Sequence, residues 1–274
     1  MPFRPPKAKE NVDKASIGGV LLAVTGVVGG LLLEGGKVSQ ILQPTAALIV
    51  FGGTAGAVLL QFPLAVIAEA CRSLLRVFLE PAANLEAGVA LLVRLANRAR
   101  REGIVQLDSE LDAIQDPFLK KALMLAVDGT EPQELRKIME LELDNQYERK
   151  ERLHMVFESA GGFSPTVGII GAVLGLIQVM QHLDKIDEVG RGIAVAFVAT
   201  IYGVAAANLL FLPAAGKLRI HLREDQIRSE MMLEGVVSVL EGMNPRMLET
   251  KLRSFLTESH VDLRPKANAQ EAGA

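Results

Sequence analysis

The sequence predicts an all-α membrane protein with four transmembrane helices, a large cytoplasmic helical domain between the second and third of them, and a helical cytoplasmic tail. Of its 274 residues, 50% are hydrophobic and 22% are charged. Asp, Glu, Lys and Arg are absent from four long stretches, residues 15–33, 38–68, 159–183 and 192–216. A helix crosses a bilayer with about 20 apolar residues, so each stretch can form one span.

The spans divide the chain into five segments. We expect an N-terminal arm at 1–14, two spans within 15–68, a helical domain at 69–158, two spans within 159–216, and a C-terminal helix and tail at 217–274. Lys and Arg concentrate in the arm and after the second and fourth spans. Because cytoplasmic loops carry the excess of these residues, both termini and the central domain should be cytoplasmic.

Apolar residues recur at helical spacing in the polar segments. We expect helices over 69–79, 84–101 and 117–128, with a break at Pro81, an N-cap at Asn84 and a stop at the Asp128–Gly129 pair. The stretch 133–157 should run into the third span, and 217–240 should continue the fourth. From Asn244 on the helix signal weakens, and 265–274 should be frayed.

Composition argues against several functions. A net charge of -3 without a long basic run argues against nucleic acid as a partner. A single cysteine, Cys71, excludes an internal disulfide, and the four histidines are too scattered to predict a metal site. No nucleophile with a base and no phosphate loop is recognisable, so we expect neither enzymatic catalysis nor a cofactor.

Small residues recur four apart in the spans. Gly26 and Gly30, Gly52 and Gly56, and Gly171 and Gly175 would let helix backbones approach closely, either within one chain or between identical chains. In the fourth span one narrow stripe contains small residues and one hydroxyl: Gly192, Ala196, Thr200, Gly203 and Ala207. Such a stripe either receives another helix tightly or leaves a small wet gap. The Thr200 hydroxyl either bonds its own backbone, the common fate, or serves a function.

Two prolines lie at nearly the same depth. Pro165 begins the third span and Pro213 ends the fourth, and each removes a backbone hydrogen bond. Pro165 fits a first-turn proline, which costs nothing, whereas Pro213 lies in a helix that continues and predicts a kink. A pair of kinks here would form a hinge between the membrane part and the cytoplasmic part.

The spans contain no ionisable side chain at mid-depth. A self-sufficient pump or transporter keeps such a group to carry its charge. If this chain moves ions, the titrating group must therefore come from a partner.

Two motifs carry a family resemblance. The run 196–203, AFVATIYG, continues to Asn208, Phe211, Pro213, Lys217 and Leu218, and it resembles the last span of flagellar motor stator A-subunits, the MotA/PomA branch of the MotA/TolQ/ExbB family. The third span, PTVGIIGAVLGL at 165–176, matches the same family. The resemblance covers nearly the whole chain, including the four spans, the large loop and the tail.

The resemblance implies a bacterial inner-membrane ion channel and motor. Members form a homo-oligomeric ring, by analogy a pentamer, around a dimer of single-span B-subunits whose aspartate binds the driving ion. Ion flow would turn the ring, and its cytoplasmic domain would push on a FliG-type rotor ring protein.

The resemblance also assigns roles to residues. Thr200 matches the threonine that faces the ion path, and Pro165 and Pro213 match the prolines of the coupled conformational change. Aligned on Gly103, Arg100 and Asp108 match the charged pair that contacts the rotor, with Arg98, Arg101 and Glu110 close by. Packing against a partner helix is expected at Gly168, Gly175, Ala196, Gly203 and Ala207.

Ala172 predicts the driving ion. Sodium-driven relatives carry a threonine at this position, and a sodium ion needs several oxygen ligands to replace its water shell. A methyl group offers none, so we predict that protons drive this protein.

Three other functions fit the sequence less well. A TolQ/ExbB-type energiser of outer-membrane processes would resemble a three-span plan, which four spans contradict. An independent transporter would need internal repeats and its own polar site in the membrane, and neither is visible. A structural scaffold would explain the small residues but not the threonine stripe or the two prolines.

Overall fold

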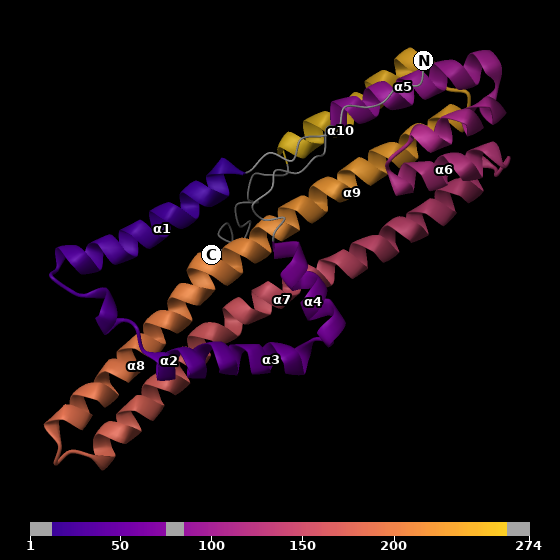
Figure 1. The fold of residues 1–274 in the computed structure, drawn as a ribbon. Coiled ribbons are helices and arrows are strands. Elements are labelled where there is room, and N and C mark those ends of the chain that lie inside the picture. The colour runs from indigo at the N-terminus through magenta and orange to yellow at the C-terminus, as the bar shows by residue number, and fades with distance from the viewer. Residues whose placement is uncertain (1–12, 75–84, 262–274) are drawn as a thin grey trace, which may run out of the picture. The chain divides into compact units, whose positions relative to one another are not determined.

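The computed structural model describes the backbone of residues 13–74 and 85–261 (Figure 1) and the side chains as far as residue 256. The described backbone is helical apart from turns and short links. Contacts divide the described residues into two units, which we call the span unit (13–74 and 149–220) and the polar unit (85–148 and 221–261). Asn84, Pro81 and the tail 265–274, about which the sequence made predictions, lie outside the described residues.

Four helices of the described chain are long and apolar enough to cross a membrane, as predicted. The first, α1 (Lys14–Leu33), has no buried residue. The second is built from α2 (Pro44–Ala47), a π-helical turn (Leu48–Gly52) and α3 (Gly53–Gln61). The third lies in α7 (Pro132–Gln181), and the fourth is α8 (Ile186–Ala206) with its continuation.

The second span is shorter than the apolar stretch that predicted it. The 38–40 segment forms a separate 3-10 turn, and the span helix ends at Gln61. Phe62 has an extended backbone (φ -122°, ψ 144°) because the proline that follows disfavours the α region. A new helix, α4 (Leu64–Ser73), begins five residues before the expected start at Glu69.

Helices α7 and α9 contribute residues to both units. The predicted continuity of 133–157 with the third span is confirmed, since α7 runs unbroken for 50 residues. The fourth span continues through a π-helical turn (Ala207–Phe211) into α9 (Leu212–Leu240), as the stretch 217–240 predicted. In the span unit, α7 and α9 bury an apolar cluster that includes Leu153, Phe157, Ala214 and Leu218.

The polar unit packs α5 (Leu85–Glu102), a 3-10 segment (Ile104–Ala113), α6 (Pro117–Val127), α10 (Pro245–Val261) and parts of α7 and α9 around one apolar core. Leu92, Leu107, Met139 and Leu248 are fully buried in this core. Helix α6 ends before Asp128 and Gly129, as predicted. It begins at a cap that the sequence reasoning did not name, where Asp116 accepts from the N–H groups of Phe118 and Leu119 at 3.0 Å each.

Helix α10 corrects the expectation that helix structure weakens after Asn244. The Asn244 side chain accepts from the Arg246 N–H at 3.0 Å, and Pro245 occupies the first helical position. Leu248 and Leu252 are fully buried, and α10 packs on α5. Many polar residues surround the apolar stripe of α10, so its average composition gives only a weak helix signal. The Asn244–Pro245 pair is nevertheless a recognisable helix start.

Candidate functional site

Glycines bring α7 and α8 close together inside the span unit. A Cβ on Gly168 would lie 2.9 Å from the Ala199 carbonyl oxygen, and one on Gly203 would lie 2.6 Å from the Ser164 carbonyl oxygen. A Cβ on Gly175 would lie 2.7 Å from the Gly192 carbonyl oxygen. These are backbone atoms that cannot swing away, so only glycine permits this approach.

The small-residue stripe of the fourth span could either pack closely against another helix or leave a wet gap. The structure shows close packing against α7. Gly168, Gly175, Ala196 and Gly203 pack α7 on α8 within one chain. Gly26, Gly30 and Gly56 differ, because a Cβ on any of them would meet nothing within 4 Å. The packing of a partner helix against Gly168, Gly175, Ala196, Gly203 and the buried Ala207 stays a prediction.

Thr200 lies on α8 opposite Gly168. Its Cα is 3.5 Å from the place a Gly168 Cβ would take, and Ala172 is one turn further along α7. Both Thr200 and Ala172 are half-buried. The Thr200 hydroxyl donates to the Ala196 carbonyl at 3.2 Å, which is the backbone bond expected of a membrane threonine. The hydroxyl oxygen keeps its lone pairs, so the same group can still accept or ligate.

The two prolines interrupt their helices differently. Pro165 lies within α7 and leaves the Gly161 carbonyl without its usual N–H donor. The neighbouring Ser164 is fully buried, and its hydroxyl donates to the Gly203 carbonyl of α8 at 3.0 Å. Pro213 is the second residue of α9 and follows the π-helical turn, in which the Leu212 N–H donates to the carbonyl of Ala207, five residues back.

This turn gives Pro213 its irregular surroundings. A π-helical turn inserts one extra residue into a helix, and such turns are frequent at functional sites. Pro165 is half-buried and Pro213 is exposed. The sequence indicated a kink near Pro213 but not the π-helical turn, which no composition signal marks.

Tyr202, to which no role is assigned from the sequence, joins α8 to the link before the second span. Its hydroxyl donates to the Ile41 carbonyl and accepts from the Gln43 N–H at 3.3 Å. Its ring lies 6.1 Å from that of Phe51, centroid to centroid. Tyrosine in an apolar run was an available signal, because a buried phenol hydroxyl needs a partner.

An ion pair that the sequence did not predict joins the start of α1 to α9. The Asp13 carboxylate caps α1 by accepting from the Ala15 N–H at 2.9 Å, and it also pairs with the Lys217 ammonium. The hydrogen bond from Lys217 holds the pKa of Asp13 well below its usual range, and a bond from the Ser16 hydroxyl adds to the effect. The two ends of the four-span sequence are thereby tied within the span unit.

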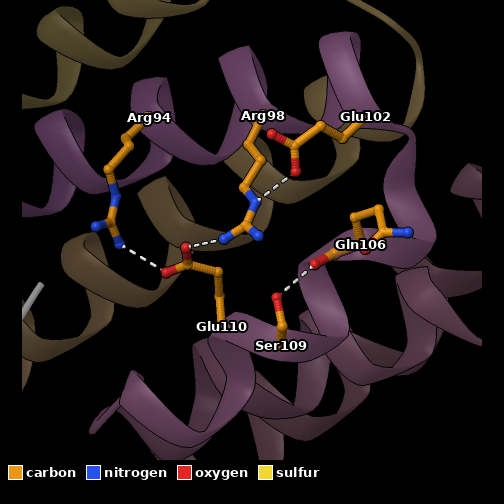
Figure 2. A network of polar contacts seen from close by, with 6 residues as sticks. All are labelled: Arg94, Arg98, Glu102, Gln106, Ser109 and Glu110. Carbon is orange, nitrogen blue, oxygen red and sulfur yellow. Dashed lines mark hydrogen bonds and ion pairs between the residues drawn. The ribbon is translucent and has the colours of Figure 1, made fainter. Parts of the chain in front are cut away.

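In the polar unit, α5 and the 3-10 segment share a network of charges (Figure 2). The Arg94 guanidinium lies 3.1 Å from the Glu110 carboxylate, and the Arg98 guanidinium pairs with both Glu110 and, at 3.0 Å, Glu102. These two carboxylates raise the pKa of Arg98, Glu102 having the larger effect. The network holds the 3-10 segment against α5.

Arg100 and Asp108 lie next to this network but outside it. Both side chains are exposed, and neither forms an ion pair with another described residue. The neighbouring alternatives Arg98 and Glu110 instead neutralise each other. Of the charges near Gly103, Arg100, Asp108 and the equally exposed Arg101 are therefore available for a contact outside the chain.

Comparison with known proteins shows the family of this chain. The profile of the MotA/TolQ/ExbB proton channel family matches residues 110–260, and the motility protein A N-terminal profile matches residues 17–103. This chain belongs to the MotA/TolQ/ExbB proton channel family. The predicted resemblance is thus confirmed over both halves of the sequence.

Individual members of the family are similar over most of their length. Motility protein A of Bacillus subtilis is 37% identical over 247 residues, which are 89% of this chain and 91% of that protein. Chemotaxis protein PomA of Vibrio alginolyticus is 28% identical, over 87% of this chain and 96% of that protein.

Solved stator complexes share the fold. A chain of the C. jejuni MotAB structure superposes with a TM-score of 0.85 at 33% identity, covering 93% of this chain and 100% of that one. The flagellar MotAB stator complex from Bacillus subtilis gives a TM-score of 0.82 at 35% identity, covering 92% of this chain and 100% of that one. The polar unit and the four spans are therefore those of a stator A-subunit.

Proposed function

We propose that this protein is the A-subunit of a flagellar stator, which conducts ions with a single-span B-subunit and converts the flow into torque on the rotor. The observation that carries the proposal is the absence of Asp, Glu, Lys and Arg from the four apolar stretches 15–33, 38–68, 159–183 and 192–216. An ion crossing the bilayer needs a group that binds it at depth, and at the predicted ion path this chain would contribute the Thr200 hydroxyl and backbone carbonyls but no carboxylate. The B-subunit would bring the carboxylate.

The driving ion is the proton. Ala172 lies one turn along α7 from Gly168, the residue that faces Thr200, and its methyl group offers no oxygen ligand. The Thr200 hydroxyl already donates to the Ala196 carbonyl of its own helix. One hydroxyl does not replace the water shell of a sodium ion, whereas a carboxylate alone accepts a proton. Swimming speed and torque should therefore persist when sodium is replaced by potassium, and strict sodium dependence would contradict the assignment.

The rotor contact is assigned to Arg100 and Asp108. Their exposure and the absence of an ion pair with described residues support this role, because an intermolecular contact requires charges that the chain does not neutralise itself. The rotor ring protein would be of the FliG type and lie on the cytoplasmic side, with both termini of this chain on that side. The A-subunits would form a ring, in the family's manner a pentamer, in the bacterial inner membrane.

Pro165 and Pro213 would couple ion binding to motion. Both prolines remove a helix hydrogen bond, and the π-helical turn before Pro213 adds a second irregularity in the same helix. Helices bend where their hydrogen-bond ladder is interrupted, so these positions can change angle without loss of further backbone bonds.

The test is ion flux into vesicles that contain the purified complex. Co-expression with the organism's B-subunit should give a complex that conducts protons once the channel is open, and this chain alone should not conduct. Thr200→Val, which keeps the shape but removes the hydroxyl, should slow the flux. Thr25→Val, at an exposed position of α1, is the matched control and should not. Proton flux through this chain without a partner would refute the proposal.

A further inference from the structure

A small groove lies beside Arg100 in the polar unit. Its volume is about 250 Å³, and its walls come from the end of α5, the first residue of the 3-10 segment and the turn between α9 and α10. The apolar lining includes Ala99, Ile104, Leu240 and Met243, and Arg100 stands at its edge. The groove is thus apolar inside and cationic at one side.

The wall opposite α5 is held by the backbone. Gly242 has a positive φ of 73°, which allows its N–H to donate to the Val239 carbonyl at 3.1 Å while the Met243 N–H donates to the Ser238 carbonyl at 3.0 Å. This pair of bonds is the Schellman motif that closes a helix C-terminus. Because the motif fixes the backbone of Met243, the groove is present before any partner arrives, and binding would cost little ordering entropy.

Charge at the edge indicates the chemistry of the occupant. Arg100 and Arg101 are both exposed, and neither is in an ion pair with any residue of the described ranges. The uncompensated Arg100 guanidinium at the edge of the apolar groove, with Arg101 next to it in the sequence, favours a ligand that places a carboxylate next to an apolar group.

The volume of the groove indicates what kind of group can occupy it. Pockets for small molecules measure about 300–1,000 Å³, so this groove falls just below that class. It is adequate for one large apolar side chain, and such inserted side chains supply much of the binding free energy at protein interfaces.

We propose that this groove is the apolar half of the rotor contact, and that it receives a large apolar side chain from a rotor helix that carries a carboxylate within one turn of it. The inference rests on the proposed function, because it assumes that Arg100 faces the rotor. It adds to the charge contact an anchor that salt cannot screen, so the stator would keep part of its grip on the rotor at high ionic strength.

Ala99→Leu tests the groove by filling it, in the complete complex with the B-subunit. The matched control is Ala90→Leu, the same change at an exposed position of the same helix, outside the groove. We expect Ala99→Leu to weaken binding of the organism's rotor ring protein by about tenfold, the loss of one anchor, while Ala90→Leu leaves it unchanged. Torque measured on tethered cells should fall in the same order.

A second variant covers the case in which Ala99→Leu lowers the melting temperature of the complex. Met243→Ala removes a wall of the groove without adding bulk, and it should also weaken rotor binding. If Arg100→Gln weakens binding while Ala99→Leu and Met243→Ala behave like Ala90→Leu, the groove inference is wrong and the proposed charge contact stands. If Arg100→Gln and Asp108→Asn also leave binding unchanged, the proposed rotor contact itself is wrong.

Discussion

Tyr202 places two hydrogen bonds on one hydroxyl, to the Ile41 carbonyl and from the Gln43 N–H. Tyr202→Phe keeps the ring against Phe51 but leaves both backbone groups without this partner. Loss of such a bond costs about 1 kcal/mol, so the melting temperature of the purified complex should fall. Tyr147→Phe is the control, since the Tyr147 hydroxyl bonds no other described residue, and equal shifts for the two variants would contradict the argument.

His154 predicts a pH dependence of stability. It is buried beside Leu153 and Phe157, and its Nδ1 atom has no hydrogen-bond partner among the described residues. Burial lowers the pKa of His154, and the nearby Arg219 lowers it further, although Glu158 and Glu151 act in the opposite direction.

The sign of this dependence follows from proton linkage. Above the unfolded pKa of about 6.5, His154 is neutral in both states and stability does not vary with its titration. As the pH falls below that value, the unfolded chain binds a proton that the folded chain resists, so stability falls until the lower folded pKa is passed. His154→Gln should therefore flatten the melting temperature between about pH 5 and 7. An unchanged slope would show that His154 titrates normally.

The contact between α7 and α8 depends on glycine at its closest points. Gly203→Ala would place a methyl group 2.6 Å from the Ser164 carbonyl oxygen and force the helices apart. Overpacking of this kind costs about 1–3 kcal/mol, so this variant should unfold at a lower temperature than the parent. Gly190→Ala, in the same helix where a Cβ would meet nothing within 4 Å, should not be destabilised. Equal stability of both variants would mean that the interface can relax.

Helix boundaries show where periodicity alone misleads. The 38–68 stretch contains no charge, yet Phe62 and Pro63 end the span helix before its final residues. Conversely, α10 lies in a stretch with a weak helix signal, and it forms because Leu248 and Leu252 pack into the core against other helices. Tertiary burial contributes more to a short amphipathic helix than intrinsic propensity does.

Across the described chain, some charges are paired within the fold and others are exposed without an ion pair. Arg98→Gln breaks the pairs with Glu102 and Glu110, so it should lower the melting temperature of the complex. Arg100→Gln removes an exposed charge that has no ion pair in the described chain, so it should leave stability unchanged and reduce torque. A thermal scan and a tethered-cell assay on both variants separate the two effects, and the reverse pattern would exchange the two roles.

Helix α1 has an apolar surface that the rest of the described chain does not cover. Its apolar residues Leu21, Leu22 and Leu33 are 63%, 76% and 91% exposed, and none of its residues is buried. Such a surface is stable only against lipid or another chain. The B-subunit and neighbouring A-subunits of the proposed ring, together with lipid, would cover it.

The amino-acid sequence alone determined that there are four spans, that none places Asp, Glu, Lys or Arg at mid-depth, and which family the chain resembles. These are properties of consecutive residues, because a helix that crosses a bilayer needs about 20 neighbouring apolar side chains. The tertiary structure alone decided which groups meet: Tyr202 bonds Ile41 from 161 residues away, and Arg98 rather than Arg100 is neutralised by Glu110. Partners far apart in the chain leave no local pattern, so their pairing depends on how the helices pack.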